Sequence, residues 1–161
     1  MSRKKLNKIP KVATHWDALM ESLTELASEH ERSGWETFLL HPGDVAAVAN
    51  REKDRPAEFR LVAPQSEVES LRDSLDRTDR YTEFNVRRAA VEGVALFAVN
   101  VRSPSTHSEV LFPLYYDPSV DTAFGQELTV AAELHVRITT LSADDPVLFE
   151  LDDPELFSTA Q

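Results

Sequence analysis

The sequence predicts a single α+β domain, in which a largely antiparallel sheet of about six strands has three helices packed on it. Its 161 residues suit one domain, because domains usually hold ~100–200 residues. Three segments that are typical of strands follow one another closely in the second half of the chain. The helical patterns are separated from each other by strands, which is the arrangement of an α+β fold.

The first helix is predicted from the spacing of its apolar side chains, which recur every three or four residues from Trp16 to His30. Thr14 is the expected N-cap, because its hydroxyl can accept a hydrogen bond from a free N–H of the first turn. Gly34 supplies the stop signal, since glycine readily adopts the left-handed conformation that ends helices.

Two further helices are expected. Ser66 and Glu69 have the spacing of a capping box, followed by an apolar stripe. Residues 118–133 also show helical spacing, although Gly125 lowers the helix propensity there by ~1 kcal/mol relative to alanine.

The expected strands are short apolar or alternating runs bounded by turn residues. They are Trp35–Leu40, Phe59–Ala63, Tyr81–Arg88, Val94–Val101, Glu109–Tyr116 and Leu134–Thr140. The run from Tyr81 to Tyr116 predicts a three-stranded antiparallel meander. Its middle strand is apolar at consecutive positions, so both of its faces should be covered. Pro113 in the third strand favours an edge or a bulge, because proline has no N–H to donate.

The charge distribution is the most unusual property of the chain. The first eleven residues carry five basic side chains and no acid, and we interpret residues 1–11 as a disordered basic arm. The rest holds 28 Asp and Glu against 12 basic side chains, of which only Lys53 is lysine. Such an acidic chain repels itself unless salt screens it, and arginine is less strongly hydrated than lysine. The composition therefore favours a salt-rich cytoplasm; an acidic protein from a GC-rich genome is the alternative.

Several classes of protein are excluded or made less probable by composition. Cysteine is absent, so a disulfide framework and thiolate chemistry are excluded. The four glycines are far apart and form no phosphate-binding loop, and neither a Gly-x-Ser-x-Gly elbow nor a His-Glu-x-x-His motif occurs. The longest apolar run, Val94–Val99, is too short to span a membrane, and the basic start lacks the apolar stretch of a secretory signal. We expect no cofactor, no metal and a cytoplasmic location.

A repeat marks the acidic C-terminal segment, residues 142–161, which follows the expected globular domain at residues 12–141. The motif Asp-Asp-Pro-x-Leu-Phe occurs twice, at 144–149 and 152–157. Leu148, Phe149, Leu156 and Phe157 are therefore candidate contacts for a partner protein. Alternatively, these apolar side chains pack into the core of their own domain.

Two other places could form a site. His41 and Asp44 flank a predicted tight turn at the end of a strand, where they could act in general-base or metal chemistry, or simply form the turn. Tyr116 and Asp117 end another strand and could line a pocket, although a place in the core and its rim is the alternative.

A polar surface is also conceivable on two strands. Glu83, Asn85 and Arg87 would join His135 and Arg137 if their strands were neighbours.

Five motifs give the chain a resemblance to a known group of proteins. They are Trp16-Asp17-Ala18-Leu19-Met20, Gly34-Trp35-Glu36-Thr37, His41-Pro42-Gly43-Asp44, Phe112-Pro113-Leu114-Tyr115-Tyr116 and the terminal Asp-Pro-Glu-Leu-Phe. Together they resemble an uncharacterised domain family of halophilic archaea. The resemblance implies a salt-rich habitat and transfers no catalytic residue.

The leading functional hypothesis is a non-catalytic cytoplasmic binding or adaptor domain that contacts a protein partner. The first alternative is a small hydrolase or metal-assisted enzyme that uses His41 and Asp44. A second alternative is association with RNA or the ribosome through residues 1–11, whose cations could neutralise phosphates. The acidic body opposes this last alternative.

Overall fold

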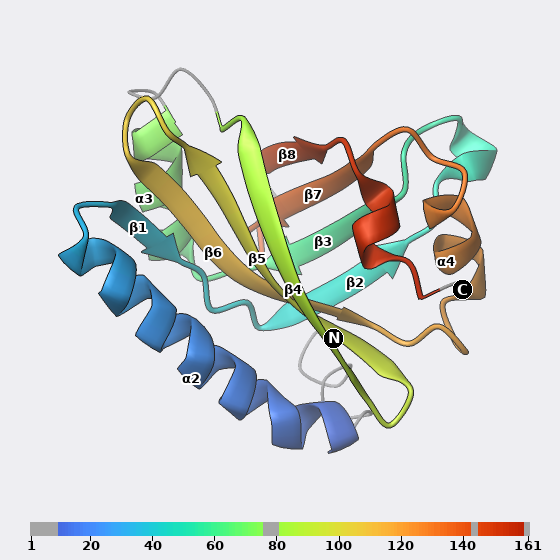
Figure 1. Cartoon of the computed structure of the whole chain (residues 1–161). Coiled ribbons are helices and arrows are strands. Elements are labelled where there is room, and N and C mark those ends of the chain that lie inside the picture. Colours follow the sequence, from blue (N-terminus) through green and yellow to red (C-terminus); the bar gives the residue numbers. More distant parts are fainter. Residues whose placement is uncertain (1–9, 76–80, 143–144, 160–161) are drawn as a thin grey trace.

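Two four-stranded sheets face each other in the computed structural model, which describes residues 10–75, 81–142 and 145–159 (Figure 1). The α-helices of these residues are α2 (Pro10–Arg32), α3 (Gln65–Leu75) and α4 (Thr122–Leu128), and the 3₁₀ turns are η1 (Arg51–Lys53) and η2 (Pro154–Phe157). The strands are β1 (Glu36–Leu39), β2 (Asp44–Val48), β3 (Glu58–Val62), β4 (Glu83–Val91), β5 (Val94–Ser103), β6 (Ser108–Tyr116), β7 (Leu134–Thr139) and β8 (Val147–Leu151). The α+β class and its three helices are confirmed for the described part of the chain.

The first sheet has the order β1-β6-β5-β4. The predicted antiparallel meander is confirmed, since β4 pairs with β5 and β5 with β6. β1 adds a short parallel partner to β6, from Glu36↔Ser108 to Leu39↔Leu111. Pro113 lies beyond the end of β1 and has a neighbouring strand on one side only, where Ala98 faces it. The missing N–H therefore falls at a local edge, although β6 is a central strand.

The second sheet has the order β2-β3-β7-β8. β2 and β8 pair antiparallel with their neighbours, whereas β3 and β7 run parallel. The sequence predicted β3 and β7 but neither β2 nor β8. The prediction of about six largely antiparallel strands is roughly right, because most of the strand pairs are antiparallel. The expected single sheet is corrected to two mixed sheets with eight strands among the described residues.

Aromatic side chains fill the space between the sheets. Phe59 from the second sheet contacts Phe97 and Tyr116 from the first, with ring centroids 6.4 and 6.1 Å apart. Phe124 of α4 and Phe157 of η2 close this cluster, with centroids 4.8 and 5.8 Å from Phe59. All five side chains are fully buried.

α2 covers the outer face of the first sheet, where it packs mainly on β1 and β6 (Figure 1). Leu23 and Ala27 of its apolar face are buried against Leu111 of β6. The helix begins at Pro10, one turn before the predicted N-cap at Thr14, and the fixed φ of proline suits the first turn of a helix. None of the helices in the described ranges is long and apolar enough to cross a bilayer.

α4 is shorter than predicted, since it covers only Thr122–Leu128 of the 118–133 segment. Asp117 begins a separate turn before it, in which its carboxylate accepts hydrogen bonds from Ser119. The helical periodicity of the segment therefore reflects one real helix with turns on either side of it.

Candidate functional site

The predicted site residues near the ends of β1 and β6 have different surroundings. His41 is tied to α3, because its backbone N–H donates to Glu67 at 2.7 Å and its Nδ1 lies 2.7 Å from the same carboxylate. Tyr116 is buried elsewhere, in the core, and its hydroxyl donates to the carbonyl of Phe157 at 2.7 Å. Asp44 lies near Tyr115, the residue before Tyr116. Burial raises the pKa of Tyr115 to about 12, and the negative charges of Asp44 and Asp121 contribute to this shift.

The C-terminal repeat is part of the fold. Phe149 and Phe157 are buried in the core, so for these aromatic side chains the structure shows the alternative in which the repeat packs on its own domain. Leu148 and Leu156 keep exposed fractions of 41% and 40%.

The polar surface that would combine β4 with β7 does not exist, because these strands belong to different sheets. Residues 1–9 of the basic arm lie outside the described residues, and its last two residues belong to α2.

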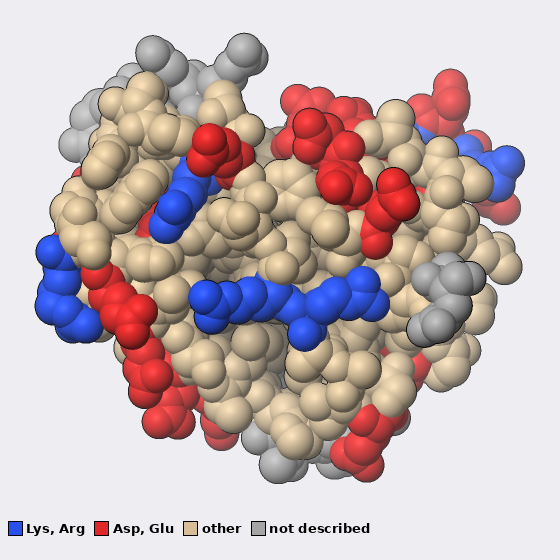
Figure 2. All heavy atoms as spheres, viewed as in Figure 1, with Lys and Arg blue, Asp and Glu red and all other residues tan. Residues whose placement is uncertain are grey.

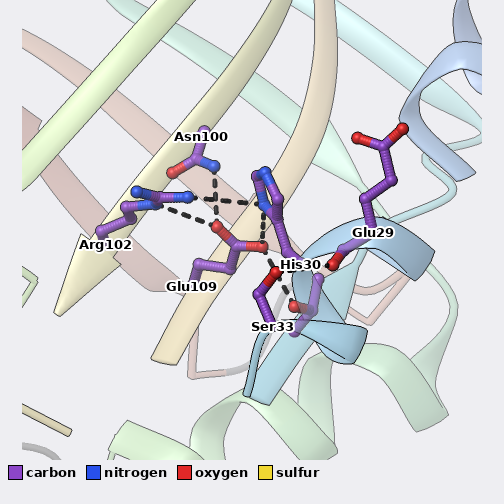
Figure 3. Close-up of polar contacts among 7 residues, drawn as sticks. Glu29, His30, Ser33, Asn100, Arg102 and Glu109 are labelled. Atoms are coloured by element: carbon purple, nitrogen blue, oxygen red, sulfur yellow. Dashed lines mark hydrogen bonds and ion pairs between the residues drawn. The ribbon is translucent and has the colours of Figure 1, made fainter. Parts of the chain in front are cut away.

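The structure instead assembles a polar cluster around Glu109, a fully buried carboxylate on β6 (Figure 3). Its Oε2 lies 2.6 Å from Nδ1 of His30 and accepts a hydrogen bond from Thr37 at 3.0 Å. Its Oε1 accepts hydrogen bonds from Asn100 at 2.8 Å and from Arg102 at 3.1 Å. Four side chains from α2, β1 and β5 therefore hold one carboxylate, which offsets the cost of burying its charge.

The register of the first sheet explains this cluster. Arg102 of β5 and Thr37 of β1 are the direct cross-strand partners of Glu109, and Asn100 lies two residues from Arg102 on the same face. α2 passes over that face and contributes His30 from its last turn. The guanidinium of Arg102 also lies 4.2 Å from the ring centroid of Trp35, which fixes it further.

A groove adjoins the cluster, because α2 packs on β1 and β6 and leaves the outer face of β4 and β5 less covered. Two cavities of about 330 and 320 Å³ lie between α2 and these strands, and they share Leu23, Leu26, Arg87 and Ala98. We call this continuous depression the α2–β4 groove. Its apolar lining includes Leu19, Leu23, Leu26, Leu96, Ala98 and Leu111.

The ionisable side chains of the described residues in the groove are arginines and histidines. They are Arg87, Arg88, Arg102, His15 and His30, and among the described residues no Asp or Glu lines either cavity. Figure 2 shows a band of Lys and Arg atoms across the middle of this face, over β4, whose basic residues are Arg87 and Arg88. Arg88 reaches the carbonyl of Leu156 at 3.4 Å, whereas Arg87 has no hydrogen bond or ion pair with any described residue. The lining thus combines apolar side chains with arginines, which is chemically complementary to an anion that also carries apolar groups.

Neither the cluster around Glu109 nor the α2–β4 groove was predicted from the sequence. The sequence predicts a strand at Glu109–Tyr116 but gives Glu109 no role in it. A signal was present: Asn100 and Arg102 alternate after an apolar run, and Glu109 stands at the head of the next one. That pattern indicates polar residues on one face of a buried hairpin.

Among the described residues, one group of side chains could hold a metal ion: Glu133, His135 and Glu150. It lies away from the groove, since His135 is on β7, Glu150 is on β8 and Glu133 directly precedes β7. No curated protein and no solved structure matches this chain. A family model matches residues 3–158, nearly the whole chain, and the protein therefore belongs to a family of unknown function, DUF7529.

Proposed function

We propose that this protein is a non-catalytic binding domain, and that the α2–β4 groove takes an acidic segment with apolar side chains from a partner protein. One observation supports this most strongly: in a chain with 28 acidic residues, no Asp or Glu of the described residues lines this apolar groove, which carries three arginines. Charge complementarity of this kind selects a partner and its orientation. Each cavity has the size of a small binding pocket, since such pockets begin at ~300 Å³.

The shape of the groove favours a peptide. His15 and His30 mark its two ends on the helix, and fifteen residues of helix correspond to about 22 Å. Its arginines belong to both cavities: Arg102 lines one, Arg88 lines the other and Arg87 lines both. A segment with several carboxylates and apolar side chains between them matches that spacing better than a single charged headgroup does.

Substitution of Arg87 by Ala is expected to weaken binding of an acidic probe peptide about tenfold, which corresponds to about 1.4 kcal/mol, because arginine is one of the residue types that dominate binding energies at interfaces. The probe is a fluorescent peptide in which Asp and Glu alternate with Leu and Phe, and its affinity is measured by fluorescence anisotropy. Arg87 is exposed and has no polar partner among the described residues, so the fold should not change.

The matched control is Arg51→Ala, which removes an exposed arginine from η1, outside the groove. It should leave the affinity unchanged, and an amide version of the peptide with Asn and Gln should bind far more weakly. Equal losses for both variants would show that only overall charge matters. Tight binding of decanoate, with no binding of the peptide, would overturn the peptide as the ligand.

We also propose that the protein works in a salt-rich cytoplasm, as its acidic and lysine-poor composition suggests. With a formal charge of −11, the acidic side chains repel one another at low ionic strength, which destabilises the folded state. Salt weakens this repulsion, because the screening length falls from about 10 Å at 0.1 M to about 3 Å at 1 M salt. The Tm should therefore rise clearly from about 0.1 M to about 1 M KCl. A sucrose series at matched osmolality separates screening from exclusion effects, and a Tm that is independent of KCl would contradict this part of the proposal.

A further inference from the structure

Three side chains of the second sheet converge on its outer face. His135 lies on β7, Glu150 is its direct cross-strand partner on β8, and Glu133 stands two residues before His135. Nε2 of His135 is 3.0 Å from Oε1 of Glu133 and 3.6 Å from Oε2 of Glu150. The three ligand atoms all lie within 4.8 Å of one another.

Hydrogen bonding alone leaves this cluster incompletely satisfied. A neutral imidazole with its proton on Nε2 can donate it to one carboxylate, yet two carboxylates face that nitrogen. No Lys or Arg of the described residues forms an ion pair with either of them. The arginines on this face, Arg60 and Arg137, both pair with Glu58 instead. Two negative charges therefore share a single nitrogen, and a cation would satisfy all three groups at once.

We infer that Glu133, His135 and Glu150 form a binding site for Zn²⁺, independently of the function proposed for the groove. Zinc–nitrogen and zinc–oxygen bonds of about 2.0–2.2 Å in a tetrahedral site place neighbouring ligand atoms about 3.4 Å apart. The two distances from Nε2 lie on either side of that value. Two ligands sit on paired strands, so only small side-chain movements are needed.

The ligand set favours zinc over the hard cations. Mg²⁺ and Ca²⁺ prefer all-oxygen sites, whereas an imidazole with two carboxylates suits zinc. The side chain of His135 is only 15% exposed, while those of Glu133 and Glu150 are 41% and 63% exposed. The ion can therefore enter from solvent, and water would complete its coordination.

Isothermal titration of the full chain with ZnCl₂ tests the site. The wild-type protein should bind one Zn²⁺ at it, and both His135→Gln and Glu150→Gln should weaken this binding at least tenfold. Zn²⁺ should also raise the Tm of the wild type and not that of Glu150→Gln, because the ion links β7 to β8. Glu150 is exposed, so this variant keeps the fold, which its Tm without metal verifies.

His41→Gln is the matched control, since His41 faces one glutamate only and should not contribute. Retained Zn²⁺ affinity in both His135→Gln and Glu150→Gln would overturn the site. Equal binding of Mg²⁺ that survives His135→Gln would also overturn it, because it would reveal a general attraction of cations to an acidic surface.

Discussion

Replacement of Glu109 by Ala is expected to lower the free energy of unfolding by about 3–5 kcal/mol, the usual cost of breaking a buried ion pair. The substitution leaves the guanidinium of Arg102 and the amide of Asn100 without their acceptor, in a place from which water is largely excluded. It also removes the acceptor of Thr37 and the partner of His30. Since domains have a total stability of ~5–15 kcal/mol, the loss is a large fraction of it. Urea unfolding, followed by circular dichroism, measures it.

The control is Glu67→Ala, which removes the carboxylate that pairs with His41 at a similar distance. This pair lies at the surface, with side chains 55% and 23% exposed, so its loss should cost no more than ~1 kcal/mol. Glu109→Gln should fall between the two, because its amide can still accept one hydrogen bond but turns a donor towards other donors. A Glu109→Ala effect as small as that of Glu67→Ala would show that burial of Glu109 is incomplete in solution.

The same substitution links stability to the proposed function. His30 and Arg102 line the α2–β4 groove, and Glu109 fixes both of them. The groove therefore depends on a charge that no ligand would contact directly.

Local patterns in the sequence identified most of the elements of this fold. The alternation of β7 and the apolar stripe of α2 depend only on neighbouring residues, so a single sequence reveals them. β2 was missed because its sequence, Asp-Val-Ala-Ala-Val, is short and rich in alanine, which has little preference for strands. β8 was missed although Val147, Phe149 and Leu151 are buried while Leu148 and Glu150 are exposed, which is the period of a strand. The same residues belong to the Asp-Asp-Pro-x-Leu-Phe repeat, which we interpreted as a possible contact for a partner protein.

The division into two sheets could not be predicted, because it depends on pairings between distant strands. The parallel pairs β1–β6 and β3–β7 join segments that are far apart in the chain. The sequence of one strand does not indicate which other strand it pairs with. The cluster around Glu109 has the same origin. His30 and Thr37 are 79 and 72 residues away from Glu109. The register of β1 on β6 brings Thr37 to this carboxylate, and the packing of α2 on the sheet brings His30 there.

Phe157→Ala is expected to cost about 3–5 kcal/mol, the usual effect of truncating a buried phenylalanine. Phe157 belongs to η2, and its side chain is fully buried between the sheets. Its ring centroid lies 5.0 Å from that of Phe97 and 5.8 Å from that of Phe59. A cavity would open between the two sheets, at the point where the C-terminal segment closes the core. The hydroxyl of Tyr116 is bonded to the carbonyl of Phe157, so a shift of η2 would disturb that contact as well. Thermal and urea unfolding both measure the loss.

Leu156→Ala is the matched control, because this neighbour in the same 3₁₀ turn is 40% exposed and contributes little to the core. Its loss should cost at most ~1 kcal/mol, the range of most surface substitutions. The pair also separates the two interpretations of the repeat, since a docking segment would tolerate both substitutions without loss of stability. A small effect of Phe157→Ala would mean that η2 detaches from the sheets in solution, which would expose the aromatic cluster and make the repeat available to a partner after all.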